Sequence, residues 1–190
     1  MTKTGIFGGS FNPIHNGHIA LARQLREAAG LDEVCLMVSP QNPLKQQRSL
    51  LSDDLRLQMA QRAVADEPFI HVSDYEFHLP RPSYMWNTLQ ALKADNPDRE
   101  FVLMIGGDNW EGFHRWYRAD DIIRNYQIIV YPRRGSVIDT ASLPSNVTVV
   151  EAELLDISST EIRRRVRQGL PVTDMVPASI IDAVMSYYQT

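Results

Sequence analysis

The sequence contains very little cysteine and no long hydrophobic run. Cys35 is the only cysteine among 190 residues, so one chain cannot form an internal disulfide bond. It lies in an apolar run at residues 33–38, where we expect it to pack as a small hydrophobic side chain. No apolar stretch has the length needed to cross a bilayer, and the first ten residues lack the apolar core of a signal peptide. These absences predict a cytoplasmic protein that does not associate with membranes.

An excess of positive charge is also missing. The 19 lysine and arginine residues are outnumbered by 23 aspartate and glutamate residues, which gives a formal net charge of −4. A protein that binds nucleic acid through a broad basic face would have the opposite balance, so we expect no nucleic-acid partner. A small phosphorylated ligand needs only a local cluster of cations and remains compatible with this composition.

Neither repeats nor low-complexity segments divide the chain. Its 44% hydrophobic and 22% charged residues are typical of a globular protein, and 190 residues are enough for one sizeable core. We therefore expect a single domain over residues 1–190. The sequence leaves open whether copies of the chain assemble into a homo-oligomer.

Short apolar runs alternate with longer amphipathic stretches along the chain. The runs are rich in Val, Ile, Leu and Phe and show little alternation with polar residues, which is typical of parallel strands covered on both faces. They lie at residues 4–7, 33–38, 69–72, 101–105, 127–131 and 147–150. Helical spacing of apolar residues marks the stretches 19–29, 55–64, 84–92, 162–170 and 180–185. This order predicts an α/β fold with a doubly wound parallel sheet, and a surface loop at residues 132–146.

A glycine-rich turn, GGSFNP at residues 8–13, follows the first predicted strand and precedes a predicted helix. Ligands of a doubly wound sheet bind at the carboxyl ends of its strands, where this turn is expected to lie. Gly8 and Gly9 allow backbone amides to approach an anion closely, and the helix N-terminus adds a partial positive charge. The turn therefore predicts a phosphate site, although a glycine turn before a helix is often only a turn.

The common phosphate-binding motifs are absent. A dinucleotide fingerprint beginning at Gly5 would need glycine at positions 7 and 10, where Phe7 and Ser10 stand. No glycine is followed by lysine, which excludes a P-loop. His15 and His18 lack cysteine or histidine partners at the spacing of a zinc site, so we expect no metal bound by the protein itself. What remains is the sequence HNGH at the start of the helix.

The turn and the two histidines together resemble the nucleotidylyltransferase superfamily, whose members carry a (H/T)-x-G-H motif on this Rossmann-like fold. Further segments are similar to its other motifs: SPQNPLK at 39–45 to the lysine-bearing loop, IGGD at 105–108 to G-x-D, and ISSTEIR at 157–163 to ISSTxIR. The segments GGSFNPIHNGH at 8–18 and SYMWNTL at 83–89 most resemble the nicotinate mononucleotide adenylyltransferase branch.

This resemblance implies transfer of the adenylyl group of ATP to nicotinate mononucleotide, a step of NAD biosynthesis that releases pyrophosphate. The attacking phosphate monoester has a second pKa of about 6, so it is largely ionised at neutral pH and needs no general base. The barrier comes from repulsion between anions and from charge on the reacting phosphorus. Alignment and fixed positive charge lower such a barrier.

The resemblance also implies roles for individual residues. His18 is expected to bind the α-phosphate of ATP and His15 a phosphate farther along, while Lys45 reaches the phosphates from its loop. Apart from the resemblance, the Ser-x-x-Glu spacing of Ser158 and Glu161 predicts a capping box at the start of a helix. The full ATP-binding set is Gly8, Gly9, Ser10, Phe11, His15, His18, Gly106, Asp108, Ile157, Ser158, Ser159 and Arg163.

Arg163, with Ser159, is expected to form a second phosphate cradle and to be catalytic together with His15, His18 and Lys45. Mg²⁺ is expected to enter with the triphosphate, because no cage of carboxylates is visible. The two histidines and the late helix should therefore meet on one polyphosphate.

A second set of residues is expected to bind the mononucleotide. Trp116 would stack on the cationic pyridinium ring, and Met85 and Thr88 would line its pocket. Each of these three also fits an ordinary place in the core. The full set is Ser10, Lys45, Met85, Thr88, Trp116 and Tyr117.

Other functions remain compatible with these motifs. The acceptor could instead be nicotinamide mononucleotide or phosphopantetheine, with the same chemistry at the phosphates. A nucleotide-binding sensor that has lost catalysis is a further alternative, which the full set of basic motif residues disfavours.

Overall fold

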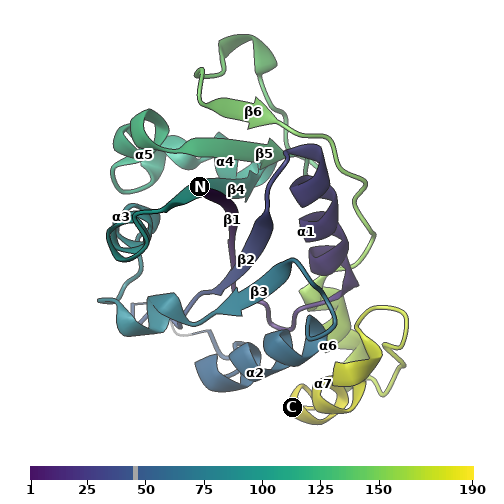
Figure 1. The fold of residues 1–190 in the computed structure, drawn as a ribbon. Coiled ribbons are helices and arrows are strands. Elements are labelled where there is room, and N and C mark those ends of the chain that lie inside the picture. Colours follow the sequence, from purple (N-terminus) through teal and green to yellow (C-terminus); the bar gives the residue numbers. More distant parts are fainter. Residues whose placement is uncertain (45–46) are drawn as a thin grey trace.

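The computed structural model describes residues 1–44 and 47–190, and within them it contains one six-stranded parallel sheet (Figure 1). The strands are β1 (Thr2–Gly9), β2 (Glu33–Val38), β3 (Ile70–Ser73), β4 (Arg99–Gly106), β5 (Gln127–Tyr131) and β6 (Val147–Val149). Their order in the sheet is β3-β2-β1-β4-β5-β6, and every neighbouring pair is parallel. The order reverses between β1 and β4, which is where a doubly wound sheet binds ligands.

Helices cover both faces of the sheet, which confirms the predicted fold class. The helices are α1 (Asn16–Ala28), α2 (Asp53–Ala63), α3 (Met85–Asp95), α4 (Gly107–Glu111), α5 (Ala119–Asn125), α6 (Ser159–Arg167) and α7 (Ile181–Tyr187). In Figure 1, α3 and α5 lie on one side of the sheet and α1, α2, α6 and α7 on the other. Short 3₁₀ turns occupy Tyr75–His78, Phe113–Arg115, Thr140–Ser142 and Ala178–Ile180.

The two faces of the sheet bury separate hydrophobic cores. On β1, Phe7 belongs to the core under α1 and α2, whereas its neighbour Ile6 belongs to the core under α3 and α5. Both side chains are almost fully buried, at 5% and 1% exposure. A strand buried on both faces has no polar side to alternate with. That is why the strands read as continuous apolar runs in the sequence.

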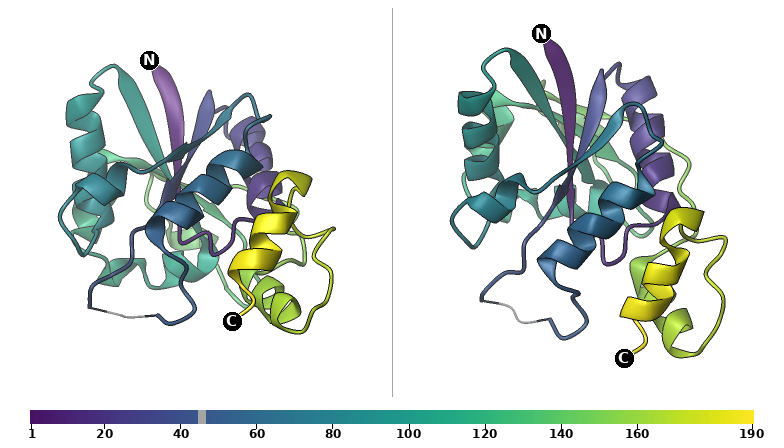
Figure 2. Two further views of the ribbon diagram at one scale, coloured as in Figure 1. Left: turned by 90° about the horizontal axis from the view of Figure 1, so that it is seen from below. Right: turned by 60° about the horizontal axis from the view of Figure 1, so that its bottom comes forward.

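The end of the chain returns to the beginning of α1. After β6 the chain crosses the molecule, and Figure 2 shows α6 and α7 beside α2. The amide of Asn16 donates to the carbonyl of Met175 at 2.9 Å, and the Tyr188 hydroxyl donates to Asn12 Oδ1 at 2.7 Å. These bonds hold the C-terminal part of the chain against the glycine turn and the start of α1.

Two elements, α4 and α5, were not predicted. Both are short, with five and seven residues, so they offer too few apolar positions for a helical period. The predicted loop at 132–146 does join β5 to β6, and only Thr140–Ser142 within it forms a 3₁₀ turn.

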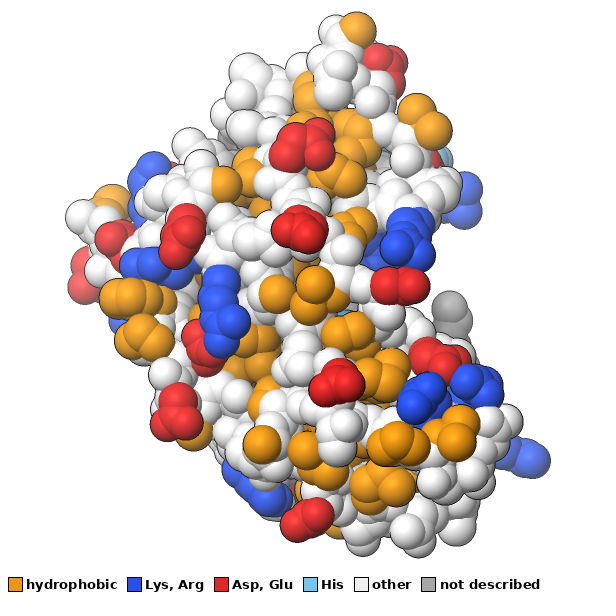
Figure 3. Space-filling model, turned by 90° about the vertical axis from the view of Figure 1, so that its right-hand side faces the viewer, with side chains coloured by type: hydrophobic (Ala, Val, Ile, Leu, Met, Phe, Trp, Pro, Cys, Tyr) orange, Lys and Arg blue, Asp and Glu red, His pale blue; other side chains and the backbone are white. Residues whose placement is uncertain are grey.

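None of the helices in the described part of the chain is both long enough and apolar enough to span a membrane. The face of the molecule in Figure 3 carries acidic and basic side chains interspersed with hydrophobic ones, without a broad basic area.

Candidate active site

A cavity of about 830 Å³ opens at the carboxyl ends of β1, β4 and β5. The glycine turn, the two histidines and the start of α6 all contribute to its lining. Of the predicted ATP-binding residues, all but Gly106 and Arg163 line this cavity. The structure therefore brings the opening motif and the late motif to one place, although about 140 residues of chain separate them.

His15 and His18 cap the start of α1 reciprocally. His15 is the N-cap residue, and its Nδ1 accepts a hydrogen bond from the Gly17 amide at 3.0 Å. The His15 amide in turn donates to Nδ1 of His18 at 3.1 Å. An Nδ1 atom that accepts cannot carry a proton, so in each neutral ring the proton lies on Nε2. Both histidines therefore have an Nε2–H group available as a donor.

Both histidines are neutral at pH 7 in the free protein. Burial, reinforced by the charge of Arg133, lowers the pKa of His15 from 6.5 to about 4. Burial, then His15 and Arg133, hold the pKa of His18 well below its usual value. The pair acts in the free protein as two preorganised neutral donors rather than as two cations.

The glycine turn contributes backbone rather than side chains. Phe11 adopts a φ of 46°. It is only 2% exposed, because its ring packs against Phe7 and His18. A Cβ atom at Gly9 would lie 3.2 Å from the Phe11 ring, which leaves little room for any side chain there. The turn can therefore present its amides to an anion at close range.

The start of α6 lines the cavity, but its residues have two different tasks. Ser158 caps the helix by accepting from the Glu161 amide at 3.1 Å. Only this half of the predicted capping box forms, because the Glu161 carboxylate pairs with Arg164. The Ser159 hydroxyl donates to the Pro13 carbonyl at 2.8 Å. Ser158 therefore remains directed to the helix end, while Ser159 ties the helix to the opening turn.

Arg163 also holds the opening turn. Its Nη1 donates to the carbonyl of Asn12 at 2.7 Å, and its side chain is not among those that line the cavity. Arg163 therefore holds a carbonyl of the turn, and its expected place in a phosphate cradle stays a prediction. Arg165, two residues further along α6, does line the cavity.

Arg133 is a cavity residue that the sequence analysis missed. It follows β5 by two residues, and its Nε lies 3.8 Å from Oδ1 of Asp108 across the end of β4. A Cβ atom at Gly106 would approach Asp108 Oδ1 to 2.5 Å and Arg133 Cγ to 2.7 Å, so glycine there lets both side chains lie over the strand end. The sequence does carry one signal for Arg133, because it lies just after a predicted strand, where a doubly wound sheet binds its ligands.

Comparisons with known proteins show the family to which the chain belongs. The cytidylyltransferase-like family model matches residues 6–165. A probable nicotinate-nucleotide adenylyltransferase of Bacteroides fragilis is 54% identical over 168 residues, covering 88% of this chain and 84% of the relative. One of Bacteroides thetaiotaomicron is 46% identical over 185 residues, covering 97% and 92%. The chain belongs to the nicotinate-nucleotide adenylyltransferase family.

A solved structure shows the same fold at low identity. The nicotinic acid mononucleotide adenylyltransferase of Plasmodium falciparum, complexed with NaAD, matches with a TM-score of 0.82 at 19% identity. The match covers 98% of this chain and 96% of the other. This likeness establishes the Rossmann-like architecture shared with that adenylyltransferase.

Part of the mononucleotide set expected for this family lies outside the cavity. Thr88 is 1% exposed, and its hydroxyl donates to Oε2 of Glu76 at 2.6 Å. Its hydroxyl thus bonds to a buried carboxyl group, and the expected contact of Thr88 with the mononucleotide stays a prediction. Burial raises the pKa of Glu76. Met85 stays near the turn, since a Cβ at Gly8 would lie 3.5 Å from its Cε.

The aromatic residues of that set each pack on another aromatic ring. Trp116 packs on Phe113 with ring centroids 4.9 Å apart, and Tyr117 lies 5.0 Å from the ring of Tyr84. Neither Trp116 nor Tyr117 lines the cavity. Lys45 lies outside the described residues.

Among the residues that the structure describes, no group of three or more His, Cys, Asp or Glu side chains is placed to hold a metal ion.

Proposed function

We propose that this chain transfers the adenylyl group of ATP to nicotinate mononucleotide, forming the deamido dinucleotide and pyrophosphate. The observation that carries this proposal is the histidine pair, because the reciprocal caps leave both Nε2–H donors for the polar cavity. The family of the chain and the NaAD complex of its structural neighbour support the same acceptor.

The reaction needs no proton acceptor from the protein. A phosphate oxygen of the mononucleotide forms a bond to the α-phosphorus of ATP, and the bond from that phosphorus to the bridging oxygen breaks. The electron pair leaves with pyrophosphate. Because the second pKa of the attacking phosphate is about 6, it is already ionised at neutral pH. The protein has to align two anions and stabilise the charge that spreads over the reacting phosphorus.

The cavity residues divide this work between them. His18 donates Nε2–H to the α-phosphate, and His15 binds the chain of phosphates beyond it. The amides of Gly9 and Phe11, with Ser10, hold a phosphate at the turn. Arg133 supplies positive charge where pyrophosphate departs, and Asp108 contacts the adenosine part of ATP.

Three further elements of the proposal come from the sequence. Lys45 reaches the phosphates from its loop. Mg²⁺ arrives bound to the triphosphate and is held mainly by phosphate oxygens and water. The reaction takes place in the cytoplasm, in keeping with a single cysteine and phosphorylated substrates.

The test is pyrophosphate release from ATP with each of three acceptors: nicotinate mononucleotide, nicotinamide mononucleotide and phosphopantetheine. We expect kcat/KM to be at least roughly tenfold higher with the acid mononucleotide, which corresponds to ~1.4 kcal/mol of discrimination. A preference for either of the other acceptors would overturn the acceptor assignment. Tight ATP binding without pyrophosphate release from any acceptor would instead identify a nucleotide sensor.

A further inference from the structure

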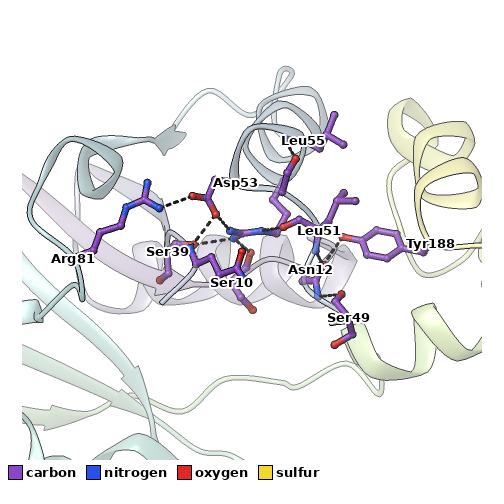
Figure 4. Close-up of polar contacts among 12 residues, drawn as sticks. Ser10, Asn12, Ser39, Ser49, Leu51, Asp53, Leu55, Arg81 and Tyr188 are labelled. Carbon is purple, nitrogen blue, oxygen red and sulfur yellow. Dashed lines mark hydrogen bonds and ion pairs between the residues drawn. The ribbon is translucent and has the colours of Figure 1, made fainter. Parts of the chain in front are cut away.

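Arg56 is a fully buried arginine, and Figure 4 labels its partners Ser10, Ser39, Leu51 and Asp53. It lies on α2 and has no exposed surface. Its Nε donates to the carbonyl of Leu51 at 2.8 Å, and its Nη1 donates to the carbonyls of Ser10 at 2.7 Å and Ser39 at 2.8 Å. Its Nη2 pairs with Oδ1 of Asp53 at 2.6 Å. One guanidinium group thus joins the glycine turn, the end of β2 and the start of α2.

The bond to Ser10 determines the direction of an amide at the cavity. The peptide between Ser10 and Phe11 is trans, since the cis bonds of the described chain are elsewhere. In a trans peptide the C=O and the next N–H point in opposite directions. The Ser10 carbonyl points at Arg56, so the Phe11 N–H points away from Arg56. Within the described part of the chain this amide has no partner, and Phe11 lines the cavity.

Two further carbonyls of the turn also accept hydrogen bonds from protein side chains. The Asn12 carbonyl accepts from Arg163, and the Pro13 carbonyl accepts from Ser159. Carbonyl oxygens that faced the cavity would repel phosphate. Holding them on protein donors leaves the N–H side of the turn to the anion.

We propose that Arg56 is a positioning residue that aims and polarises the Phe11 amide toward a substrate phosphate. The proposal rests on the proposed function, in which that amide binds phosphate. A cation bonded to the Ser10 carbonyl withdraws charge from the peptide and makes its N–H a stronger donor, as hydrogen bonds in a chain polarise one another. Arg56 itself does not touch the substrate.

Asp53 fixes the guanidinium in this arrangement. Its Oδ1 also accepts from the Gln41 amide at 2.9 Å, and its Oδ2 pairs with Arg81 at 3.0 Å. Burying a charge without such a partner is strongly unfavourable. A hydrophobic side chain could fill the same volume at lower desolvation cost, which argues that the arginine is present for what it orients.

The test compares Arg56→Lys with Arg62→Met. Lysine keeps the charge but cannot bond to four acceptors in one plane. Arg62 is a control on the same helix, where it donates to the Ser179 carbonyl rather than to a carbonyl of the turn. Pyrophosphate release at saturating substrates is measured well below each melting temperature. We expect Arg56→Lys to lower kcat by roughly 10–100-fold and Arg62→Met to leave it unchanged.

A second readout follows the Phe11 amide itself. Labelling phenylalanine with ¹⁵N gives six amide signals, and Phe11→Tyr identifies the relevant one. We expect ATP to shift this signal in the wild-type protein and to shift it much less in Arg56→Lys. If Arg56→Lys does not fold, Asp53→Asn carries the same two measurements, because it loosens the guanidinium from the side of its counterion.

The outcomes separate this proposal from the proposed function. A folded Arg56→Lys or Asp53→Asn variant could have the wild-type kcat and show the same ATP-induced shift of the Phe11 signal as the wild-type protein. That result would show that Arg56 only stabilises the fold. A wild-type protein that releases no pyrophosphate would overturn the function, while the Phe11 signal would still report on Arg56.

Discussion

His15 and His18 stack ring on ring, with centroids 3.7 Å apart and planes 27° from parallel, while their Nδ1 atoms accept backbone amides at the start of α1. Each hydrogen bond from a backbone N–H requires an unprotonated Nδ1. The close stacking also disfavours a positive charge on both rings at once. Helix capping and catalysis therefore depend on the same tautomer. Protonation of either ring would remove a cap and alter the cavity together.

The first prediction concerns the stability of the folded protein as a function of pH. Because the folded-state pKa of His15 is lowered to about 4, below its ordinary 6.5, the unfolded chain binds more protons between these values. The free energy of unfolding should therefore decrease as pH falls through that window. Between pH 7 and pH 5 the loss due to His15 is ~2 kcal/mol.

Urea unfolding at the two pH values tests this prediction. His15→Asn is the informative variant, because asparagine caps helices well and does not titrate. We expect its unfolding free energy to depend less on pH than that of the wild-type protein, by ~2 kcal/mol. An equal dependence in the two proteins would show that His15 titrates normally when folded.

The second prediction is that His18→Ala loses turnover far more than stability. Removal of the imidazole deletes one donor to the reacting phosphate, which typically lowers kcat by roughly 10²–10³-fold. It also deletes one cap acceptor, at a cost of ~1 kcal/mol. Pyrophosphate release and thermal unfolding measure the two effects. His78→Ala, an exposed histidine paired with Asp74, is the control, and near-normal turnover of His18→Ala would contradict the assigned role.

The third prediction uses the close approach of side chains at Gly106. In Gly106→Ala the new Cβ would displace Asp108 and Arg133, both exposed, from the end of β4. We expect the KM for ATP to rise by roughly tenfold with little change in melting temperature. Gly112→Ala is the matched control, since nothing lies within 4 Å of a Cβ there. Equal KM values for the two variants would remove Asp108 and Arg133 from the ATP site.

The sequence predicted the parts of this molecule that depend on local pattern. The strands β2 and β5 begin and end where their apolar runs do, because burial on both faces leaves a continuous signal. β1 extends beyond its predicted run to Thr2, where the polar residues Thr2 and Lys3 still pair with Arg99 and Glu100 of β4. The ends of such a strand are determined by pairing with the neighbouring strand, and they have no hydrophobic pattern of their own in the sequence.

Some residues of the candidate site could likewise be found from a local motif, whereas others are brought together only by the fold. The two histidines lie three residues apart, so their motif and their position at a helix start could be found in the sequence. Arg56 bonds to Ser10 and Ser39, which are 46 and 17 residues away, and only the fold brings these together. Arg163 was identified by its motif, but the motif did not show that its guanidinium faces the Asn12 carbonyl rather than the cavity.

The last prediction concerns Thr88, whose hydroxyl donates to the buried Glu76 at 2.6 Å. Thr88→Val keeps the shape of the side chain and leaves this carboxyl group without that donor, which should lower the free energy of unfolding by ~1–3 kcal/mol. Because burial already raises the pKa of Glu76, loss of the donor should raise it further, and the destabilisation should grow as pH rises from 5 to 8. Thr88→Ser, which keeps the hydroxyl, is the control. Urea unfolding across this range, with the KM for nicotinate mononucleotide measured in parallel, decides between a structural hydroxyl and one that binds the ligand. A stable Thr88→Val protein with a greatly raised KM would instead place the Thr88 hydroxyl in the mononucleotide site.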